Sequence, residues 1–128
     1  MSTQKALYLV EAKGALAVRE RDIPTPGPGE ILVEIHATAL NPVDWKIQAF
    51  DFFIKEYPTI LGTDAAGIVK AVGEGVTNLA VGDKVYVAVL LLCDGEADLG
   101  SVFRLHQGYF NTRNATFQQY TKIGRAHV

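Results

Sequence analysis

Hydrophobic and polar residues alternate in several short stretches of this chain, as they do in half-buried β-strands. The clearest stretch is residues 31–37, Ile-Leu-Val-Glu-Ile-His-Ala, which alternates after its first residues. Three further candidates are the short apolar stretch Lys5–Val10, the partly alternating stretch Ala15–Arg21 and the stretch Phe117–Ile123. Each of the four is predicted to form a strand.

Residues 57–85 combine small apolar and β-branched residues with glycines at positions 62, 67, 73, 75 and 82. This composition predicts strands interrupted by sharp turns, because glycine adopts positive φ without a Cβ clash. Strand is predicted for Ile68-Val69 and Ala71-Val72, and a tight reversal for residues 73–75. Residues 81–85 are expected to start the next strand from a second turn.

Proline and glycine mark the connections between these segments. Residues 24–29, Pro-Thr-Pro-Gly-Pro-Gly, cannot form a regular strand ladder and predict a rigid connection. Pro42 suits the first turn of a helix that Asp44 to Ala49 would continue, and residues 50–57 are expected to form an aromatic loop before Pro58. Many short strands with little helix predict a mainly β fold, closed or nearly closed into a barrel.

Composition narrows the function classes. The 128 residues fit one domain, and the 12 basic and 14 acidic side chains are scattered, so nucleic acid is not an expected partner. A single cysteine, Cys93, excludes an internal disulfide and a Cys-rich zinc site. Neither a signal peptide nor a membrane span is recognisable, so we expect a soluble, cytoplasmic protein without a membrane partner.

The glycine-rich segment also carries a family pattern. Residues 62–85 read G-T-D-A-A-G-x-V-x-x-V-G-x-G-V-x-x-x-x-V-G-D-x-V, which resembles the catalytic-domain signature of the medium-chain dehydrogenase/reductase superfamily. Within it, the chain is most similar to zinc-independent fungal enoyl reductase-like and quinone oxidoreductase-like proteins. The resemblance implies a GroES-like, partly open β-barrel with short helices over residues 1–122. No G-x-G-x-x-G follows a strand here, so we expect these residues to lack the Rossmann domain of such relatives.

Two segments do not fit the family pattern. Residues 86–104 have no counterpart in similar proteins, and we interpret them as a retained intron read in frame or a lineage-specific insert. Residues 123–128, Ile-Gly-Arg-Ala-His-Val, would be encoded by codons that spell a common sequencing adapter. We therefore predict a domain that ends at residue 122, followed by an adapter-derived tail.

The superfamily that this chain resembles contains zinc-dependent and zinc-independent members. In zinc-dependent relatives a Cys and a His occupy the positions of Asn41 and Thr63, and a Glu occupies that of Asp64. Two of the three ligands are thereby replaced with poor ones, so we predict no zinc. His36, on an alternating strand, is interpreted as a packed or surface histidine, and His106 similarly, although its loop could approach the site.

By the same resemblance, the segment Asn-Pro-Val-Asp-Trp-Lys lines the cleft that faces a nicotinamide. Asn41, Val43, Asp44, Trp45 and Lys46 are candidate NADPH contacts, and Lys46 and Thr116 are candidate catalytic residues. A structural interpretation remains open, in which Pro42 starts a helix and Asp44 stabilises its first turn.

The substrate pocket is predicted at Thr63, Asp64, Thr116 and Phe117. Asp64 could equally cap a turn, and Phe117 could be a core residue. Tyr57 could donate a proton or simply pack.

The resemblance implies the N-terminal part of an NADPH-dependent reductase that transfers hydride to an enoyl thioester or a quinone-like acceptor. Without its Rossmann domain the fragment is expected to be inactive, and the full-length protein could form a homodimer. The alternatives are a stand-alone GroES-like binding module of the co-chaperonin type, or the product of a damaged gene. A co-chaperonin should form a ring.

Overall fold

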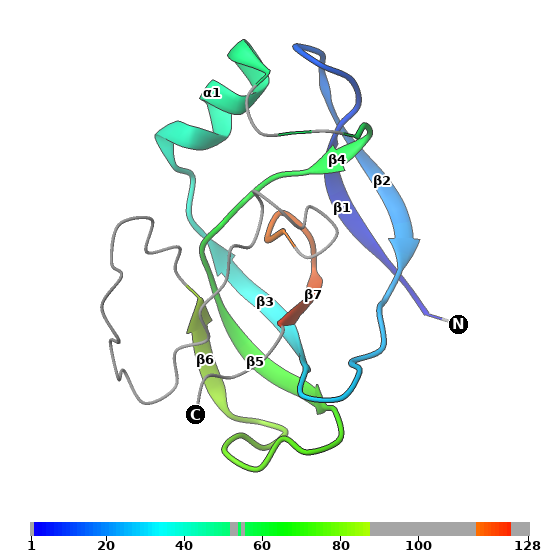
Figure 1. Cartoon of the computed structure of the whole chain (residues 1–128), viewed down its shortest axis with the longest axis vertical. Helices are drawn as coiled ribbons and strands as arrows, with labels where there is room; N and C mark the ends of the chain where they lie inside the picture. Colours follow the sequence, from blue (N-terminus) through cyan, green and yellow to red (C-terminus); the bar gives the residue numbers. More distant parts are fainter. Residues whose placement is uncertain (1, 52–53, 55, 88–114, 124–128) are drawn as a thin grey trace.

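The structure is a computed structural model that describes residues 2–51, 54, 56–87 and 115–123. Its elements follow the chain as β1 (Thr3–Leu9), β2 (Leu16–Asp22), β3 (Ile31–Thr38), α1 (Pro42–Phe50), β4 (Thr59–Ile60), β5 (Ala65–Val72), β6 (Lys84–Val87) and β7 (Tyr120–Ile123). The mainly β architecture with one short helix in these ranges confirms the predicted fold class (Figure 1). Within these ranges, no helix is long and apolar enough to cross a membrane.

The first sheet has the order β2-β1-β4. β1 and β2 form an antiparallel hairpin whose register runs from Thr3↔Asp22 to Leu9↔Leu16. The hairpin confirms the first two predicted strands to within two residues at each end. The two-residue strand β4, which pairs with the end of β1, escaped sequence analysis because two residues carry no readable alternation.

The second sheet has the order β6-β5-β3-β7. Its centre is the long antiparallel pair β3–β5, which is shifted in register between Leu32 and Val33 and between Ile35 and Ala37. β5 joins both predicted strand pieces into one strand that starts earlier, at Ala65. The strand predicted at residues 117–123 is shorter, because only its last four residues form β7.

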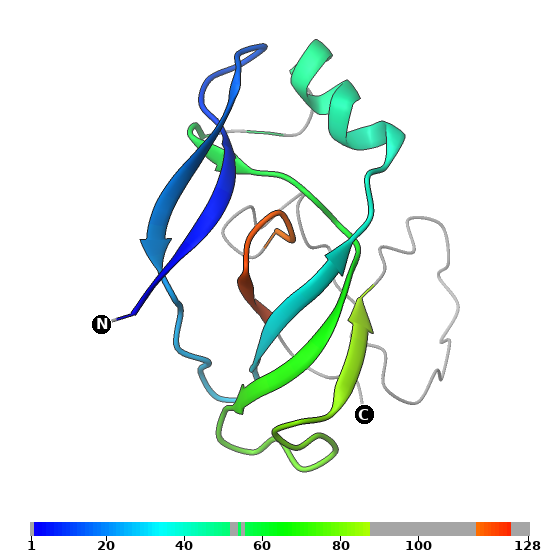
Figure 2. The same ribbon diagram turned by 180° about the vertical axis from the view of Figure 1, so that it is seen from behind.

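The segment before β7 joins the two sheets. The carbonyl of Phe117 accepts from the N–H of Leu7 on β1 at 2.8 Å. Two residues later, Gln119 donates to the carbonyl of Lys5 at 3.2 Å and accepts from the N–H of Ile35 on β3 at 2.8 Å. The chain therefore changes partner from β1 to β3 within three residues, which explains why regular strand starts only at Tyr120. Both views show this segment between the two sheets (Figure 1 and Figure 2).

Three groups of buried apolar side chains form the core. The largest lies between the strands of the second sheet and contains Ile31, Val33, Val69, Val85 and Ile123. A second group connects α1 with the first sheet and contains Leu9, Ile47 and Leu61. A third group joins the first sheet to the segment before β7 and contains Ala6, Ile60 and Ala115. Each large side chain that is fully buried in this way stabilises the fold by about 1.5–3 kcal/mol.

The glycines of residues 57–85 serve two purposes, whereas the sequence predicted one. Gly62, Gly75 and Gly82 have positive φ, as the turn interpretation requires. Gly67 lies inside β5, where a Cβ atom would stand 2.0 Å from the carbonyl oxygen of Glu34. Gly67 therefore allows β3 and β5 to approach closely and does not form a turn.

The structure describes the first residues of the predicted insert and of the predicted tail. Tyr86 and Val87, the first two residues of the insert, lie in β6 and pair with Ala66 and Ala65. Ile123, the first residue of the tail, is fully buried and pairs with Ile31 on β3. The domain end at residue 122 and the origin of both segments stay predictions. The rest of the insert, with Cys93 and His106, and residues 124–128 lie outside the described residues.

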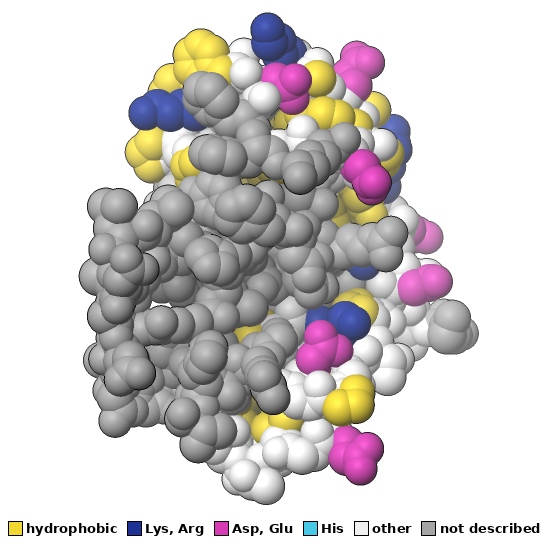
Figure 3. Space-filling view, in the orientation of Figure 1, with side chains coloured by type: hydrophobic (Ala, Val, Ile, Leu, Met, Phe, Trp, Pro, Cys, Tyr) yellow, Lys and Arg dark blue, Asp and Glu magenta, His cyan; other side chains and the backbone are white. Residues whose placement is uncertain are grey.

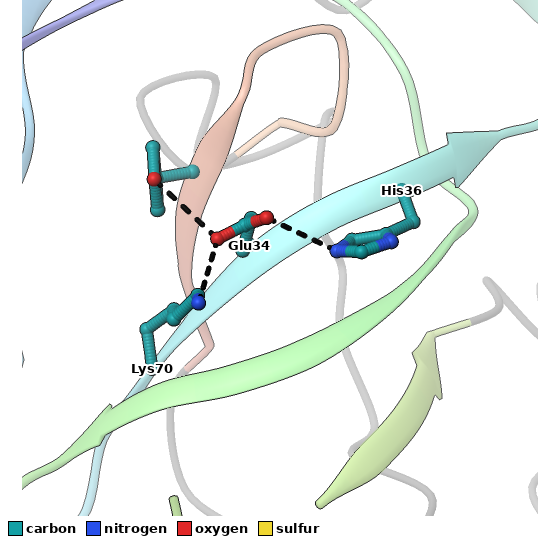
Figure 4. A network of polar contacts seen from close by, with 4 residues as sticks. Glu34, His36 and Lys70 are labelled. Atoms are coloured by element: carbon teal, nitrogen blue, oxygen red, sulfur yellow. Dashed lines mark hydrogen bonds and ion pairs between the residues drawn. The ribbon is translucent and has the colours of Figure 1, made fainter. Parts of the chain in front are cut away.

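A polar network crosses the surface of the second sheet (Figure 4). The carboxylate of Glu34 on β3 lies 3.0 Å from Lys70 Nζ on β5 and 3.1 Å from His36 Nε2, and it accepts from the Tyr120 hydroxyl at 3.5 Å. Lys70, more than any other neighbour, lowers the pKa of Glu34. His36 is half exposed here, as the surface interpretation predicted.

Candidate functional site

The candidate site begins where β3 ends and α1 starts. Asn41 is the N-cap residue, with φ −115° and ψ 153°, and Pro42 occupies the first helical turn. The carboxylate of Asp44 accepts from the backbone N–H of Asn41 at 2.9 Å, one half of a capping box. The helix runs to Phe50, one residue beyond the prediction, and Asp51 ends it in the left-handed conformation. The structural interpretation of Pro42 and Asp44 is confirmed.

The turn before β5 brings a second carboxylate to the start of α1. The side-chain amide of Asn41 donates to Asp64 Oδ2 at 2.9 Å, across 23 residues of chain. Asp44 is only 7% exposed, and its Oδ1 has no hydrogen-bond partner among the described residues. Burial raises the pKa of Asp44, and the nearby Asp64 carboxylate adds to the rise, while backbone amides of Asn41 and Gly62 oppose it.

This raised pKa gives a testable pH dependence. Because the folded state binds the Asp44 proton more tightly than the unfolded chain, the free energy of unfolding falls as pH rises from the ordinary pKa of 3.8 through the raised value. The Asp44→Asn variant has no carboxyl to titrate at this position. The difference in the free energy of unfolding between the variant and the original chain should therefore shift in favour of the variant as pH rises. Urea denaturation of both proteins from about pH 4 to about pH 7 measures the difference. Parallel stability curves would contradict the assignment.

A pair of threonine hydroxyls lies beside the same turn. Thr38 Oγ1, at the end of β3, donates to the carbonyl of Asp64 at 2.7 Å and lies 2.9 Å from Thr116 Oγ1. The Thr116 N–H in turn donates to the carbonyl of Gly62 at 3.1 Å. Only glycine fits at position 62, because its φ is +103° and a Cβ atom would stand 2.4 Å from Thr116 Oγ1. Sequence analysis overlooked Thr38, whose one signal was a hydroxyl in the apolar run of residues 37–40.

The predicted site residues divide into two groups. Asn41, Asp44 and Asp64 meet through hydrogen bonds and charge, and Thr116 and Phe117 lie against Gly62 in the same turn. Thr63, the residue between Gly62 and Asp64, is buried. Val43 packs onto the core group of Leu9, Ile47 and Leu61.

Trp45 and Lys46 form the second group, on the solvent side of α1. Trp45 is 55% exposed, and Lys46 Nζ lies 5.7 Å from the centre of its ring. The Phe50 ring lies 6.1 Å from the Trp45 ring. Hydrophobic side chains reach the surface at the end of the molecule where α1 lies (Figure 3). The helix therefore presents an aromatic face and a cation to solvent.

Tyr57 has a structural partner. Its hydroxyl donates to the carboxylate of Asp51 at the end of α1, and its ring packs onto the core group of Leu9, Ile47 and Leu61. Burial and the Asp51 carboxylate raise the pKa of Tyr57 to about 12. Both the hydroxyl and the ring thus have partners within the domain, which fits the packing interpretation.

The residues at the zinc positions of the superfamily offer poor zinc ligands. The side-chain amide of Asn41 donates to one oxygen of Asp64, and Thr63 is a buried hydroxyl residue, whereas protein zinc sites are built mainly from thiolate, imidazole and carboxylate groups. No three His, Cys, Asp or Glu side chains gather into a metal-binding group in the described part of the chain.

Comparison with known proteins connects this arrangement with a family. The sequence profile of the alcohol dehydrogenase GroES-like domain matches residues 27–128. The chain belongs to this family. The resemblance to the medium-chain dehydrogenase/reductase superfamily is thereby confirmed.

Three proteins illustrate the range of this GroES-like domain. A trans-enoyl reductase from a Penicillium species is 45% identical over 84 residues, covering 66% of this chain and 23% of that protein. A chloroplast envelope quinone oxidoreductase homolog from Arabidopsis thaliana is 51% identical over 71 residues, covering 53% of this chain and 21% of that protein. The structure of Escherichia coli quinone oxidoreductase complexed with NADPH superposes with a TM-score of 0.63 at 25% identity. The match covers 95% of this chain and 31% of that protein. The curated relatives are aligned over only 21% to 38% of their own length.

Proposed function

We propose that this GroES-like domain is the catalytic-domain part of an NADPH-dependent reductase that acts without zinc. The proposed reaction delivers hydride to the conjugated C=C bond of an enoyl thioester or to a quinone-like acceptor. The observation that carries the proposal is the start of α1, where an Asn41–Asp64 hydrogen bond stands at the zinc position. The names of similar enoyl and quinone reductases support the acceptor class.

The exposed side of α1 fits one wall of a cofactor cleft. Trp45 offers an aromatic face to a nicotinamide, and the E. coli relative was crystallised with NADPH. NADPH supplies the hydride when it is bound. Because these 128 residues contain no G-x-G-x-x-G loop for its phosphates, we place the dinucleotide-binding domain outside them and expect the chain alone to be inactive.

Within this proposal, Lys46 supplies the charge that the acceptor needs. A carbonyl oxygen conjugated to the reduced bond gains negative charge during hydride transfer, and a positioned cation stabilises it. Lys46 is exposed and lies over Trp45, so its ammonium can reach a ligand that rests on the same ring. The substrate is then a small molecule or an acyl thioester.

The test starts from the transcript that carries this chain, sequenced past the Lys122 codon. The protein that it encodes should oxidise NADPH with a quinone or an enoyl thioester, and EDTA should not inhibit it. Lys46→Met should lower kcat/KM about tenfold, which corresponds to one exposed charge-assisted hydrogen bond.

Lys84→Met, at the start of β6 and at the opposite end of the molecule from α1, is the matched control and should leave kcat/KM unchanged (Figure 1). A protein that does not oxidise NADPH would refute the reductase proposal. Loss of activity with EDTA would refute its zinc-independent part.

A further inference from the structure

The two threonine hydroxyls beside Asp64 have a fixed proton order. A hydroxyl carries one proton, and a carbonyl oxygen can only accept. Thr38 donates to the carbonyl of Asp64 at 2.7 Å, so its proton is used there. The 2.9 Å contact between the two hydroxyl oxygens must therefore use the proton of Thr116. Thr116 donates and Thr38 accepts.

This order leaves neither hydroxyl with a proton for a ligand. Thr38 Oγ1 keeps one lone pair, and Thr116 Oγ1 keeps its lone pairs but belongs to a side chain that is 1% exposed. Thr38 is exposed, at the end of β3 and three residues before Asn41. Thr38 is thus the accessible member of the pair, and it offers an acceptor. Thr116 is poorly suited to donate to a substrate carbonyl, contrary to the catalytic role that the sequence predicted for it.

We propose that Thr38, held by its hydrogen bond to the Asp64 carbonyl, is a ligand-binding residue that accepts a hydrogen bond from an N–H or O–H group of the ligand. This inference rests on the proposed reductase function, which brings two such donors to the site. One is the carboxamide of a nicotinamide, and the other is the hydroxyl of a reduced quinone-like acceptor. The pair thereby selects donors and disfavours a carbonyl at this point, because two acceptors cannot share a proton.

The test measures the binding of two matched pairs of probes to the 128-residue chain. Binding is followed by the NMR chemical shifts of the Thr38 and Asp64 backbone amides. Nicotinamide and N,N-dimethylnicotinamide form one pair, and hydroquinone and 1,4-dimethoxybenzene the other. In at least one pair, the donor-bearing member should bind about fivefold more tightly than its donor-free partner, as expected for one net hydrogen bond. Which pair shows the preference identifies the source of the donor.

Variants separate binding from a merely structural role. Thr38→Val should abolish the preference for donors, and Thr38→Ser should restore it. Thr116→Val should retain it, because Thr38 still donates to Asp64 and still accepts. Equal binding of both members of each pair, a loss confined to Thr116→Val, or no shift with any probe would overturn the inference. NADPH oxidation by the protein of the full transcript is measured independently, so the reductase proposal can stand when this inference fails.

Discussion

Gly67→Ala is expected to reduce the free energy of unfolding by about 3 kcal/mol or more. The added Cβ would stand 2.0 Å from the carbonyl oxygen of Glu34 and 2.9 Å from Val33 Cγ1. The first of these atoms is backbone, in the centre of the β3–β5 pair, so the clash cannot be relieved by turning a side chain. The two strands must separate, and the hydrogen bonds and core contacts between them weaken together.

Urea denaturation followed by circular dichroism measures this loss, with Gly82→Ala as the matched control. A Cβ at Gly82 would meet no atom within 4 Å, so that variant carries only the strain of a φ of +96°. Its expected cost is about 1 kcal/mol. Equal losses in the two variants would show that strand approach is not what requires glycine at position 67.

Gln4→Leu is expected to cost about 3 kcal/mol, although it places a hydrophobic residue in the interior. Gln4 is 2% exposed, and its side chain makes both backbone hydrogen bonds that Tyr120 directs toward β1. It accepts from the Tyr120 N–H at 2.8 Å and donates to the Tyr120 carbonyl at 3.0 Å. Leucine leaves these groups without this partner, and β7 loses two hydrogen bonds to the first sheet.

The control is Gln48→Leu, because Gln48 is half-buried and donates a single hydrogen bond, to the carbonyl of Gly14 at 2.9 Å. It should cost about 1 kcal/mol. Chemical denaturation gives both values, and hydrogen exchange at the Tyr120 amide should accelerate in the Gln4 variant alone. An unchanged exchange rate would mean that this side chain does not hold β7 to the first sheet.

Much of the local structure was predictable from the sequence. The start of α1 follows from Pro42 and Asp44, because both act within one helical turn. The strands β1 and β2 were predicted from an apolar and a partly alternating stretch, and the turns at Gly75 and Gly82 from glycine. The family pattern also indicated which segments would form the site, and Asn41, Asp44 and Asp64 do meet.

Tertiary structure decided how these segments combine. Gly67 appears in the sequence as one more turn glycine, but the strand beside it sets its role. Thr38 gains its place in the site from Asp64 and Thr116, which lie 26 and 78 residues further along the chain. The Gln4–Tyr120 contact spans 116 residues. The sequence alone determined turns, caps and alternating strands, because their causes lie within a few neighbouring residues. Strand register and the connection between the two sheets determined the hydrogen-bond partners and the proton order, because these depend on residues that only folding brings together.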